Sequence, residues 1–149
     1  MTLLAAIWLL YLSACAQEPK LLNIQALWRH GDRVPVGTYP TDPHQEDAWP
    51  VPWGEVTTKG MWQHYRQGIK IKEEYVNKLR FLNATYSVKD VYIRSTDVTR
   101  TLVSAQSNFA SLYSKSNGTF PEELGWPKPW TPVPVHTVNK DEDLIRGKT

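Results

Sequence analysis

One short segment of the sequence concentrates the residue types that handle phosphate. Arg29-His30-Gly31-Asp32-Arg33 places two guanidinium groups around one imidazole. Each guanidinium group offers a planar fork of donors to phosphoryl oxygens and keeps its charge near neutral pH. A neutral imidazole nitrogen can attack phosphorus, so His30 could form a phosphohistidine that water later hydrolyses. The segment predicts chemistry on phosphate monoesters, with Arg29 and Arg33 stabilising the transferred group without a metal ion or other cofactor.

A second cationic position, Arg94, follows the apolar run Val91-Tyr92-Ile93. Parallel strands end at the same edge of a sheet, and open α/β sheets bind their ligands outside that edge. If this run and the apolar stretch before Arg29 are two such strands, Arg94 faces the same anion as Arg29 and Arg33. We therefore predict that these three arginines bind phosphate. The amides that open the helix after Arg94 would favour an anion too.

Each of these residues also has a simpler interpretation. His30 could be a turn histidine, and Arg94 could be an ordinary charge at the end of a strand. Arg29 and Arg33 could be solvated loop charges that pair with Asp32. The combination of these residue types at the ends of two predicted strands is what favours the phosphate site.

Three short apolar runs, bounded by polar residues, predict the strands that would carry this chemistry. They span 20–28, 89–94 and 133–138. Pro134 suits the start or the edge of the last strand. Two proline-rich segments, 38–53 and 121–134, predict long surface loops.

Two helices are predicted between these strands. The first begins at Thr57 or Thr58, where a hydroxyl can cap the first amides. Its apolar positions recur near a helical period and are Met61, Tyr65, Ile69, Val76 and Leu79. The second helix has Ser95, Thr96 or Asp97 as its cap, and an apolar face of Leu102, Ala105, Phe109 and Leu112 or Tyr113. Such alternation of strands and helices is typical of an α/β domain with a parallel sheet.

The seven residues from Arg29 to Pro35 resemble the signature of the histidine acid phosphatases. Their Arg-His-Gly core is shared with the phosphoglycerate mutase-like superfamily, and the continuation Asp-Arg-Val-Pro is similar to the acid phosphatase branch. Other segments similar to this family are 54–57, 91–97 and 134–138. The resemblance implies a three-layer α/β sandwich with a mostly parallel sheet, and acid phosphatase activity on phosphate monoesters.

The resemblance also implies a role for each matching residue. His30 is then the nucleophile, and Arg29, Arg33 and Arg94 bind the phosphoryl group. Asp32 is expected to orient the arginines. Outside the signature, Arg100 is predicted to brace its helix or to pair with Asp97, and the other histidines are predicted as loop, helix-surface and strand residues, namely His44, His64 and His136.

The family's His-Asp dipeptide, whose carboxylic acid protonates the departing alcohol, has no counterpart here, because the four histidines precede Gly31, Gln45, Tyr65 and Thr137. The residues 17–149 are therefore expected to form only the N-terminal part of the phosphatase domain, with an incomplete sheet. A signal peptide is expected before it, at 1–16. The enzymatic interpretation is a truncated, secreted acid phosphatase. The alternative is a catalytically impaired, secreted protein that binds phosphorylated ligands. An unpaired first strand could also support a homodimer or pairing with a related chain.

Secretion is predicted from the first residues and from two sequons. The apolar run 3–12 is followed by small residues at 13–16, as in a signal peptide. Cys15 is the only cysteine and falls within that segment, so the mature part would hold no disulfide. Sequons at Asn83 and Asn117 fit glycosylation. We expect a secreted glycoprotein, or one in the lumen of the secretory pathway or lysosome.

Charge and residue spacing argue against two other classes of partner. The net charge is +2, and the basic residues are scattered along the chain, so no nucleic acid partner is expected. The histidines and carboxylates show no metal-ligand spacing, so no metal ion is expected either.

Overall fold

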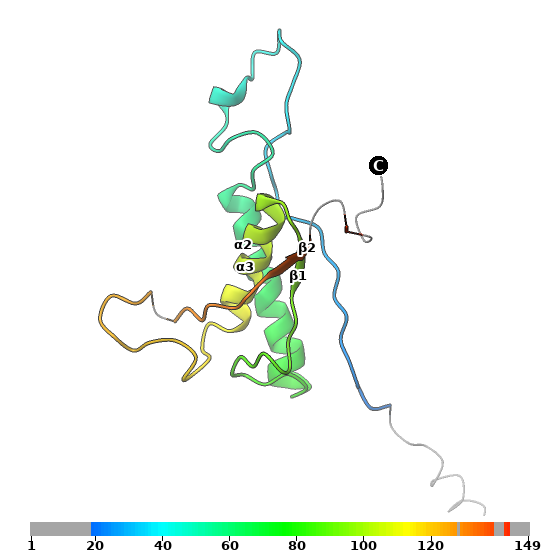
Figure 1. Ribbon diagram of the computed structural model, residues 1–149, viewed down its shortest axis with the longest axis vertical. Coiled ribbons are helices and arrows are strands. Elements are labelled where there is room, and N and C mark those ends of the chain that lie inside the picture. Colours follow the sequence, from blue (N-terminus) through cyan, green and yellow to red (C-terminus); the bar gives the residue numbers. More distant parts are fainter. Residues whose placement is uncertain (1–18, 128, 139–141, 144–149) are drawn as a thin grey trace, which may run out of the picture.

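The computed structural model describes residues 19–127, 129–138 and 142–143. Its regular elements are the 3-10 turn η1 (Glu46–Ala48), helix α2 (Thr58–Ile71), the π-helical segment η2 (Lys72–Lys78), strand β1 (Arg94–Thr96), helix α3 (Thr99–Leu112) and strand β2 (His136–Val138). Helices α2 and α3 lie side by side, and β1 packs against α3 (Figure 1). The predicted signal peptide at 1–16 lies outside the described residues.

Helix α2 begins where the sequence predicts. The Thr57 hydroxyl accepts a hydrogen bond from the Gly60 amide at 3.1 Å, which satisfies one of the amides that a first turn leaves unpaired. The same hydroxyl donates to the Asp32 carboxylate at 2.8 Å. The cap of α2 therefore also fastens the loop that carries His30.

The buried face of α2 is displaced by one residue from the predicted apolar face. Within α2 the buried residues are Gly60, His64 and Gly68, spaced one turn apart. Of the predicted positions, Val76 is buried in η2 and Met61 and Tyr65 are half-buried, but Ile69 and Leu79 are 36% and 49% exposed. The prediction is wrong for Ile69 and Leu79, because close backbone contact rather than side-chain hydropathy selects the face of α2 that meets α3.

The absence of a side chain at Gly68 lets the two helices touch. A Cβ atom there would lie 2.1 Å from the Asn108 carbonyl oxygen and 2.1 Å from the Ser111 hydroxyl oxygen. The Ser111 hydroxyl crosses the same contact and donates to the Tyr65 carbonyl at 2.6 Å. The interface between α2 and α3 is therefore built from small and polar groups.

Replacing Gly68 by alanine should lower the free energy of unfolding by about 1 to 3 kcal/mol, the usual cost of overpacking a tight contact. The added methyl group would overlap the backbone of α3, which cannot move aside as a flexible side chain can. Urea unfolding followed by circular dichroism measures the change. Gln106→Ala, on an exposed position of α3, is the control. A Gly68→Ala protein as stable as the wild type would contradict the tight packing.

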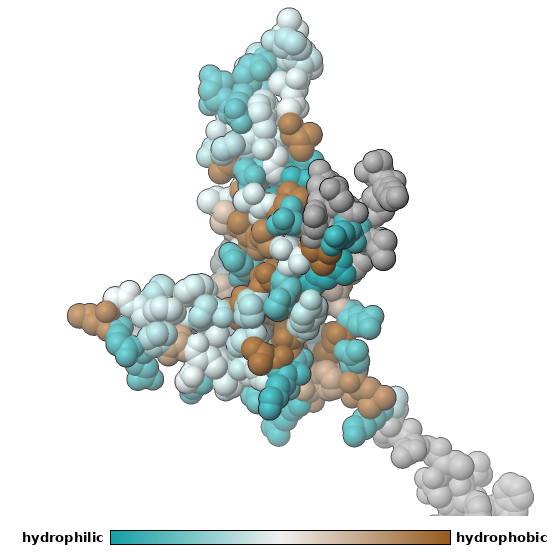
Figure 2. Space-filling model, in the orientation of Figure 1, coloured by the Kyte–Doolittle hydropathy of each residue, from teal (hydrophilic) through white to brown (hydrophobic). Residues whose placement is uncertain are grey.

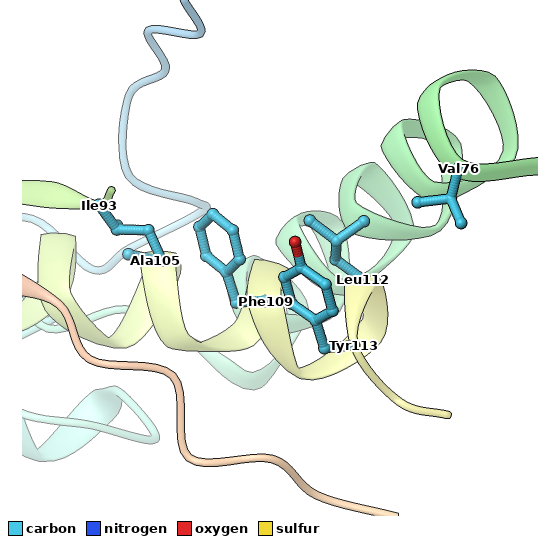
Figure 3. Close-up of a cluster of buried hydrophobic side chains, with 6 residues drawn as sticks. All are labelled: Val76, Ile93, Ala105, Phe109, Leu112 and Tyr113. Atoms are coloured by element: carbon cyan, nitrogen blue, oxygen red, sulfur yellow. The ribbon is translucent and has the colours of Figure 1, made fainter. Parts of the chain in front are cut away.

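The hydrophobic core gathers over one side of α3. Its buried members are Val76, Ile93, Ala105, Phe109, Leu112 and Tyr113, and their side chains lie along α3 between β1 and η2 (Figure 3). Trp28 packs on this cluster, with its ring centroid 6.2 Å from that of Phe109. The predicted apolar face of α3 is confirmed at its last four positions, while Leu102 is half-buried.

Strands β1 and β2 form a parallel pair, as the α/β alternation predicts. Arg94 lies opposite His136, and the His136 amide donates to the Ile93 carbonyl at 2.9 Å. Both strands are shorter than predicted. Strand β1 starts at the last residue of the predicted 89–94, and β2 occupies only the end of 133–138, beyond Pro134, which has no amide to donate.

Helix α3 begins at Thr99, later than the predicted caps. Val98 stands at the N-cap and makes no side-chain cap hydrogen bond. Ser95 and Thr96, two of the predicted caps, lie in β1 instead, where their backbone pairs with β2. That prediction is wrong because strand pairing uses these residues. The Thr101 hydroxyl donates to the Thr96 and Val98 carbonyls and so closes the first turn.

The predicted first strand, 20–28, is not a strand in the described part of the chain. It runs as an extended segment away from the helices (blue in Figure 1) and makes no backbone hydrogen bond to another described segment. Leu22 is 79% exposed and Leu27 is 89% exposed. The apolar pattern fits a strand, but a strand also needs a neighbouring backbone, and β1 pairs with β2 instead.

The two proline-rich segments are surface loops, as predicted. Segment 38–53, which contains η1, forms the arm at the top of Figure 1, and that arm is mainly hydrophilic in Figure 2. The described part of 121–134 forms a second projecting loop. Only Thr131 of this loop is buried. The predicted site residues therefore lie on the helical body and not on either projection.

Candidate functional site

The structure brings His30 and Arg94 to the same cavity. This cavity has a volume of about 600 Å³ and lies between the extended segment 23–28 and residues 90–96. Ile71 and Phe109 are among the side chains of its floor. Two residues far apart in the sequence thus meet at one hollow, as expected if both follow neighbouring extended segments.

The hydrogen bond of the His30 ring defines which nitrogen could react. Nδ1 lies 2.8 Å from the Gly31 carbonyl oxygen. A carbonyl oxygen only accepts hydrogen bonds, so Nδ1 carries the hydrogen and donates it. In the neutral ring the lone pair then resides on Nε2.

Arg29 and Arg33 do not line this cavity. Arg29 is exposed, and its carbonyl oxygen accepts a hydrogen bond from the ring of His64. Arg33 is half-buried, donates to the Val34 carbonyl at 2.6 Å, and has a buried Nε atom without a hydrogen-bond partner. Of the three predicted phosphate ligands, Arg94 is the one that lines this cavity.

Arg94 forms an ion pair within the cavity. One of its guanidinium nitrogens donates to Asp143 Oδ1 at 2.8 Å, and the Asp143 side chain is only 3% exposed. The cavity-lining guanidinium group of Arg94 is thus paired with a carboxylate. Asp143 was not among the predicted site residues, since no spacing or motif in the sequence connects it to Arg94.

The loop Arg29–Asp32 is anchored through its backbone. The Gly31 amide donates to the Ser104 hydroxyl at 3.1 Å, and the Asp32 amide donates to Gln63 Oε1 at 2.8 Å. A Cβ atom on Gly31 would lie 2.4 Å from the Gly60 carbonyl oxygen, so only glycine allows this approach. The loop that carries His30 is held by both helices.

Asp32 does not orient an arginine, contrary to the prediction. Its carboxylate accepts a hydrogen bond from the Thr57 hydroxyl and lies 4.0 Å from the Lys59 ammonium group. The reason is local: the first turn of α2 brings a hydroxyl and a cation nearer to Asp32 than Arg29 or Arg33. Asp32 therefore joins the loop to the start of α2.

His64 is a buried residue and not the helix-surface residue that was predicted. It is 4% exposed, and Nε2 lies 3.1 Å from the Arg29 carbonyl oxygen. Burial lowers the pKa of His64 from its ordinary value of 6.5, the hydrogen bond to Arg29 partly offsets this, and the charge of His30 lowers it further. Sequence periodicity missed His64 because it lies between two glycines, Gly60 and Gly68, and not between apolar residues.

The lowered pKa of His64 predicts a loss of stability in acid. The unfolded chain binds a proton near pH 6.5 and the folded chain only at lower pH, so stability is fully present above 6.5 and declines as the pH falls towards the folded pKa. Urea unfolding at a series of pH values measures this slope. His64→Gln should flatten it between pH 7 and 5, whereas His44→Gln, in an exposed loop, should not. An unchanged slope in His64→Gln would contradict the assignment.

The remaining polar candidates do not line this cavity. His44 lies in a loop and His136 lies in β2, stacked on the Tyr92 ring at 4.9 Å, as predicted for both. Arg100 makes no ion pair with Asp97 within the described residues. Among the described residues, no group of three or more potential ligands could hold a metal ion, and no helix is long and apolar enough to cross a membrane.

Comparisons with known proteins identify a family for this chain. A family model described as histidine phosphatase superfamily (branch 2) matches residues 20–146. The chain is 45% identical over 144 residues to the prostatic acid phosphatase of Mus musculus, covering 93% of this chain and 35% of that protein. It is 45% identical over 130 residues to the lysosomal acid phosphatase of Bos taurus, covering 87% of this chain and 29% of that protein. The chain thus spans about a third of the length of these relatives.

A solved structure shows the same fold. The Klebsiella sp. ASR1 phytase superposes with a TM-score of 0.53 at 20% sequence identity, over 76% of this chain and 26% of that one. The two helices and the parallel strand pair are therefore an α/β arrangement that also occurs within a larger protein.

Proposed function

The chain belongs to the histidine phosphatase superfamily (branch 2), and we propose that it supplies the nucleophile and part of the phosphate site of an acid phosphatase that hydrolyses phosphate monoesters. The observation that carries this proposal is the meeting of His30, with its Nδ1 hydrogen donated to Gly31, and Arg94 at one cavity. A nucleophilic nitrogen and a fixed cation are the two groups that metal-free phosphoryl transfer requires.

The proposed reaction has two displacements. The Nε2 lone pair of His30 forms a bond to phosphorus while the ester P–O bond breaks, and the bonding electrons leave on the alcohol or phenol oxygen. A water oxygen then displaces Nε2, which releases inorganic phosphate and restores the neutral ring. The imidazole of the intermediate is positively charged, and the Gly31 carbonyl stabilises that charge through the Nδ1 hydrogen.

The arginines would stabilise charge on the phosphoryl oxygens. Arg94 lines the cavity and is assigned the direct contact. We assign Arg29 and Arg33 to the same anion because they flank His30 on one anchored loop, and their side chains would turn towards a bound phosphoryl group. In the proposed whole protein, the strand pair and helices form the N-terminal part of a three-layer α/β sandwich.

Arg94→Ala is expected to weaken the binding of inorganic phosphate by about tenfold or more, since it removes a charge-assisted hydrogen bond. Asp143→Ala should strengthen binding by about threefold, because the carboxylate that pairs with Arg94 no longer competes with the anion. Isothermal titration calorimetry with the full chain measures both affinities.

Two further variants control this experiment. Arg66→Ala removes an exposed arginine of α2 and should leave phosphate affinity unchanged. The double variant Arg94→Ala/Asp143→Ala should bind as weakly as Arg94→Ala, which shows that the loss does not come from an unpaired carboxylate. Equal affinity of Arg94→Ala and the wild type would remove Arg94 from the phosphate site.

A second candidate function is the binding of another polypeptide chain. Segment 20–28 is extended and makes no backbone hydrogen bond to another described segment. Its residues 23–28, which include the exposed Leu27, border the 600 Å³ cavity. An extended strand with free backbone groups favours pairing with a further strand, from a second copy or from a related chain. Sedimentation velocity over a range of concentrations tests this, and a monomer at every concentration would argue against a homodimer.

We also propose passage through the secretory pathway, to the outside or to the lysosome. Relatives include proteins named lysosomal acid phosphatase. Asn83 and Asn117, the two sequon residues, are exposed, as glycan attachment requires. Treatment of the secreted product with an N-glycosidase should lower its mass, and an Asn83→Gln/Asn117→Gln protein should show no change.

A further inference from the structure

His64 contacts the residue that precedes the proposed nucleophile. The Arg29 carbonyl oxygen, 3.1 Å from Nε2, only accepts hydrogen bonds, so Nε2 carries the hydrogen and donates it. The other ring nitrogen, Nδ1, is buried and has no hydrogen-bond partner in the described structure. With 4% exposure, His64 donates this hydrogen bond from a buried position.

The other hydrogen bonds that hold this loop do not involve the Arg29 carbonyl. The amides of Gly31 and Asp32 donate to Ser104 and Gln63, so both helices hold the later part of the loop. In these two contacts Ser104 and Gln63 accept, and the Ser104 hydroxyl donates its own hydrogen to the Arg100 carbonyl at 2.7 Å. Among the described residues, His64 supplies the one hydrogen bond given to that oxygen, and its loss would leave a partly buried acceptor unpaired.

The Arg29 carbonyl and the His30 amide belong to one peptide plane. Because that plane is rigid, fixing the oxygen also fixes the nitrogen and the Cα atom from which the His30 side chain projects. A displacement of about 1 Å in a reacting group can lower a rate by about 100-fold. Control of this plane therefore controls how Nε2 of His30 meets phosphorus.

We propose that His64 is a positioning residue for phosphoryl transfer, which directs His30 by holding the Arg29 carbonyl and does not touch the phosphoryl group. The proposal rests on the proposed function, because it presumes that His30 is the nucleophile. It separates two properties of the site: phosphate affinity depends on the arginines, and the rate of transfer depends on the direction of the His30 ring.

Two substitutions of His64 test this role in the full chain. His64→Leu keeps an apolar side chain of similar size but has no donor. His64→Gln can place its amide nitrogen near the position of Nε2 and so keeps the donor. His64→Leu should lower the rate of phosphoryl labelling by phenyl phosphate about 100-fold, while its affinity for inorganic phosphate changes by less than about threefold. His64→Gln should label at a rate within about tenfold of the wild type. The control variant His44→Leu should label at the wild-type rate.

Other outcomes would overturn the role. Wild-type labelling by His64→Leu would make His64 an ordinary core residue, as would a parallel loss of rate and affinity in both variants. If His64→Leu does not fold, His64→Gln decides: labelling within tenfold supports the donor role, and a 100-fold loss contradicts it.

If the wild type takes up no label, the proposed function fails. Hydrogen exchange of the Gly31 and Asp32 amides then tests the hydrogen bond between His64 and the Arg29 carbonyl by itself. If His64 holds this loop, both amides should be less protected from exchange in His64→Leu than in His64→Gln.

Discussion

His30→Ala should abolish the phosphoryl label that the wild-type chain takes up from phenyl phosphate, and should lower hydrolysis by about 10³-fold or more. The reason is that the Nε2 lone pair of His30 is the proposed attacking group, and alanine offers no substitute. A phosphorus bound to imidazole nitrogen is acid-labile and base-stable, which separates it from phosphoserine and phosphothreonine. Quenching in base followed by peptide mapping locates the label.

Matched histidine variants make this result specific. His44→Ala, in an exposed loop, and His136→Ala, in β2, should keep the label at the wild-type level. Label that persists in His30→Ala would show that the nucleophile is wrongly assigned. Circular dichroism of each variant establishes that the protein remains folded, which is expected because the loop is anchored through the backbone of Gly31 and Asp32.

Local signals in the sequence predicted those elements whose structure depends on neighbouring residues. The start of α2 follows from a Thr57 hydroxyl placed to reach the Gly60 amide, and the apolar face of α3 follows from a helical period of large side chains. The meeting of His30 and Arg94 at one cavity was also predictable, because apolar runs precede both residues. The cap of α2 and the apolar face of α3 can each be read within one or two turns of chain.

Features that depend on distant backbone were not predictable in the same way. Segment 20–28 has the composition of a strand but pairs with no described neighbour, and Ser95 has the chemistry of a cap but lies in a strand. His64 looked like a surface residue, since its burial depends on α3 approaching glycines of α2. The pairing of Arg94 with Asp143 had no sequence signal either.

The second large expected effect concerns the leaving group. Among the residues that the structure describes, the carboxyl groups that line the cavity are Asp90 and Asp143. Asp90 is exposed, and Asp143 accepts a hydrogen bond from Arg94. We propose that neither carboxyl group protonates a departing alkoxide, and absence of a general acid typically costs about 10²- to 10⁴-fold. We expect nitrophenyl phosphate to label His30 at least about 100-fold faster than glycerol phosphate, because a nitrophenolate leaves without protonation.

Rates of label formation, and not steady-state turnover, must be compared, since all substrates share the hydrolysis of one phosphohistidine and a slow second step would hide differences in the first. Across a series of aryl phosphates, the logarithm of the labelling rate should then fall steeply as the pKa of the leaving phenol rises. The His64→Leu variant should follow the same slope at a lower rate, because its change concerns the direction of the nucleophile and not the departing oxygen. A flat slope, with aryl and alkyl esters labelling alike, would mean that a proton donor acts in this cavity, and Asp90→Asn and Asp143→Asn would show which carboxyl group it is.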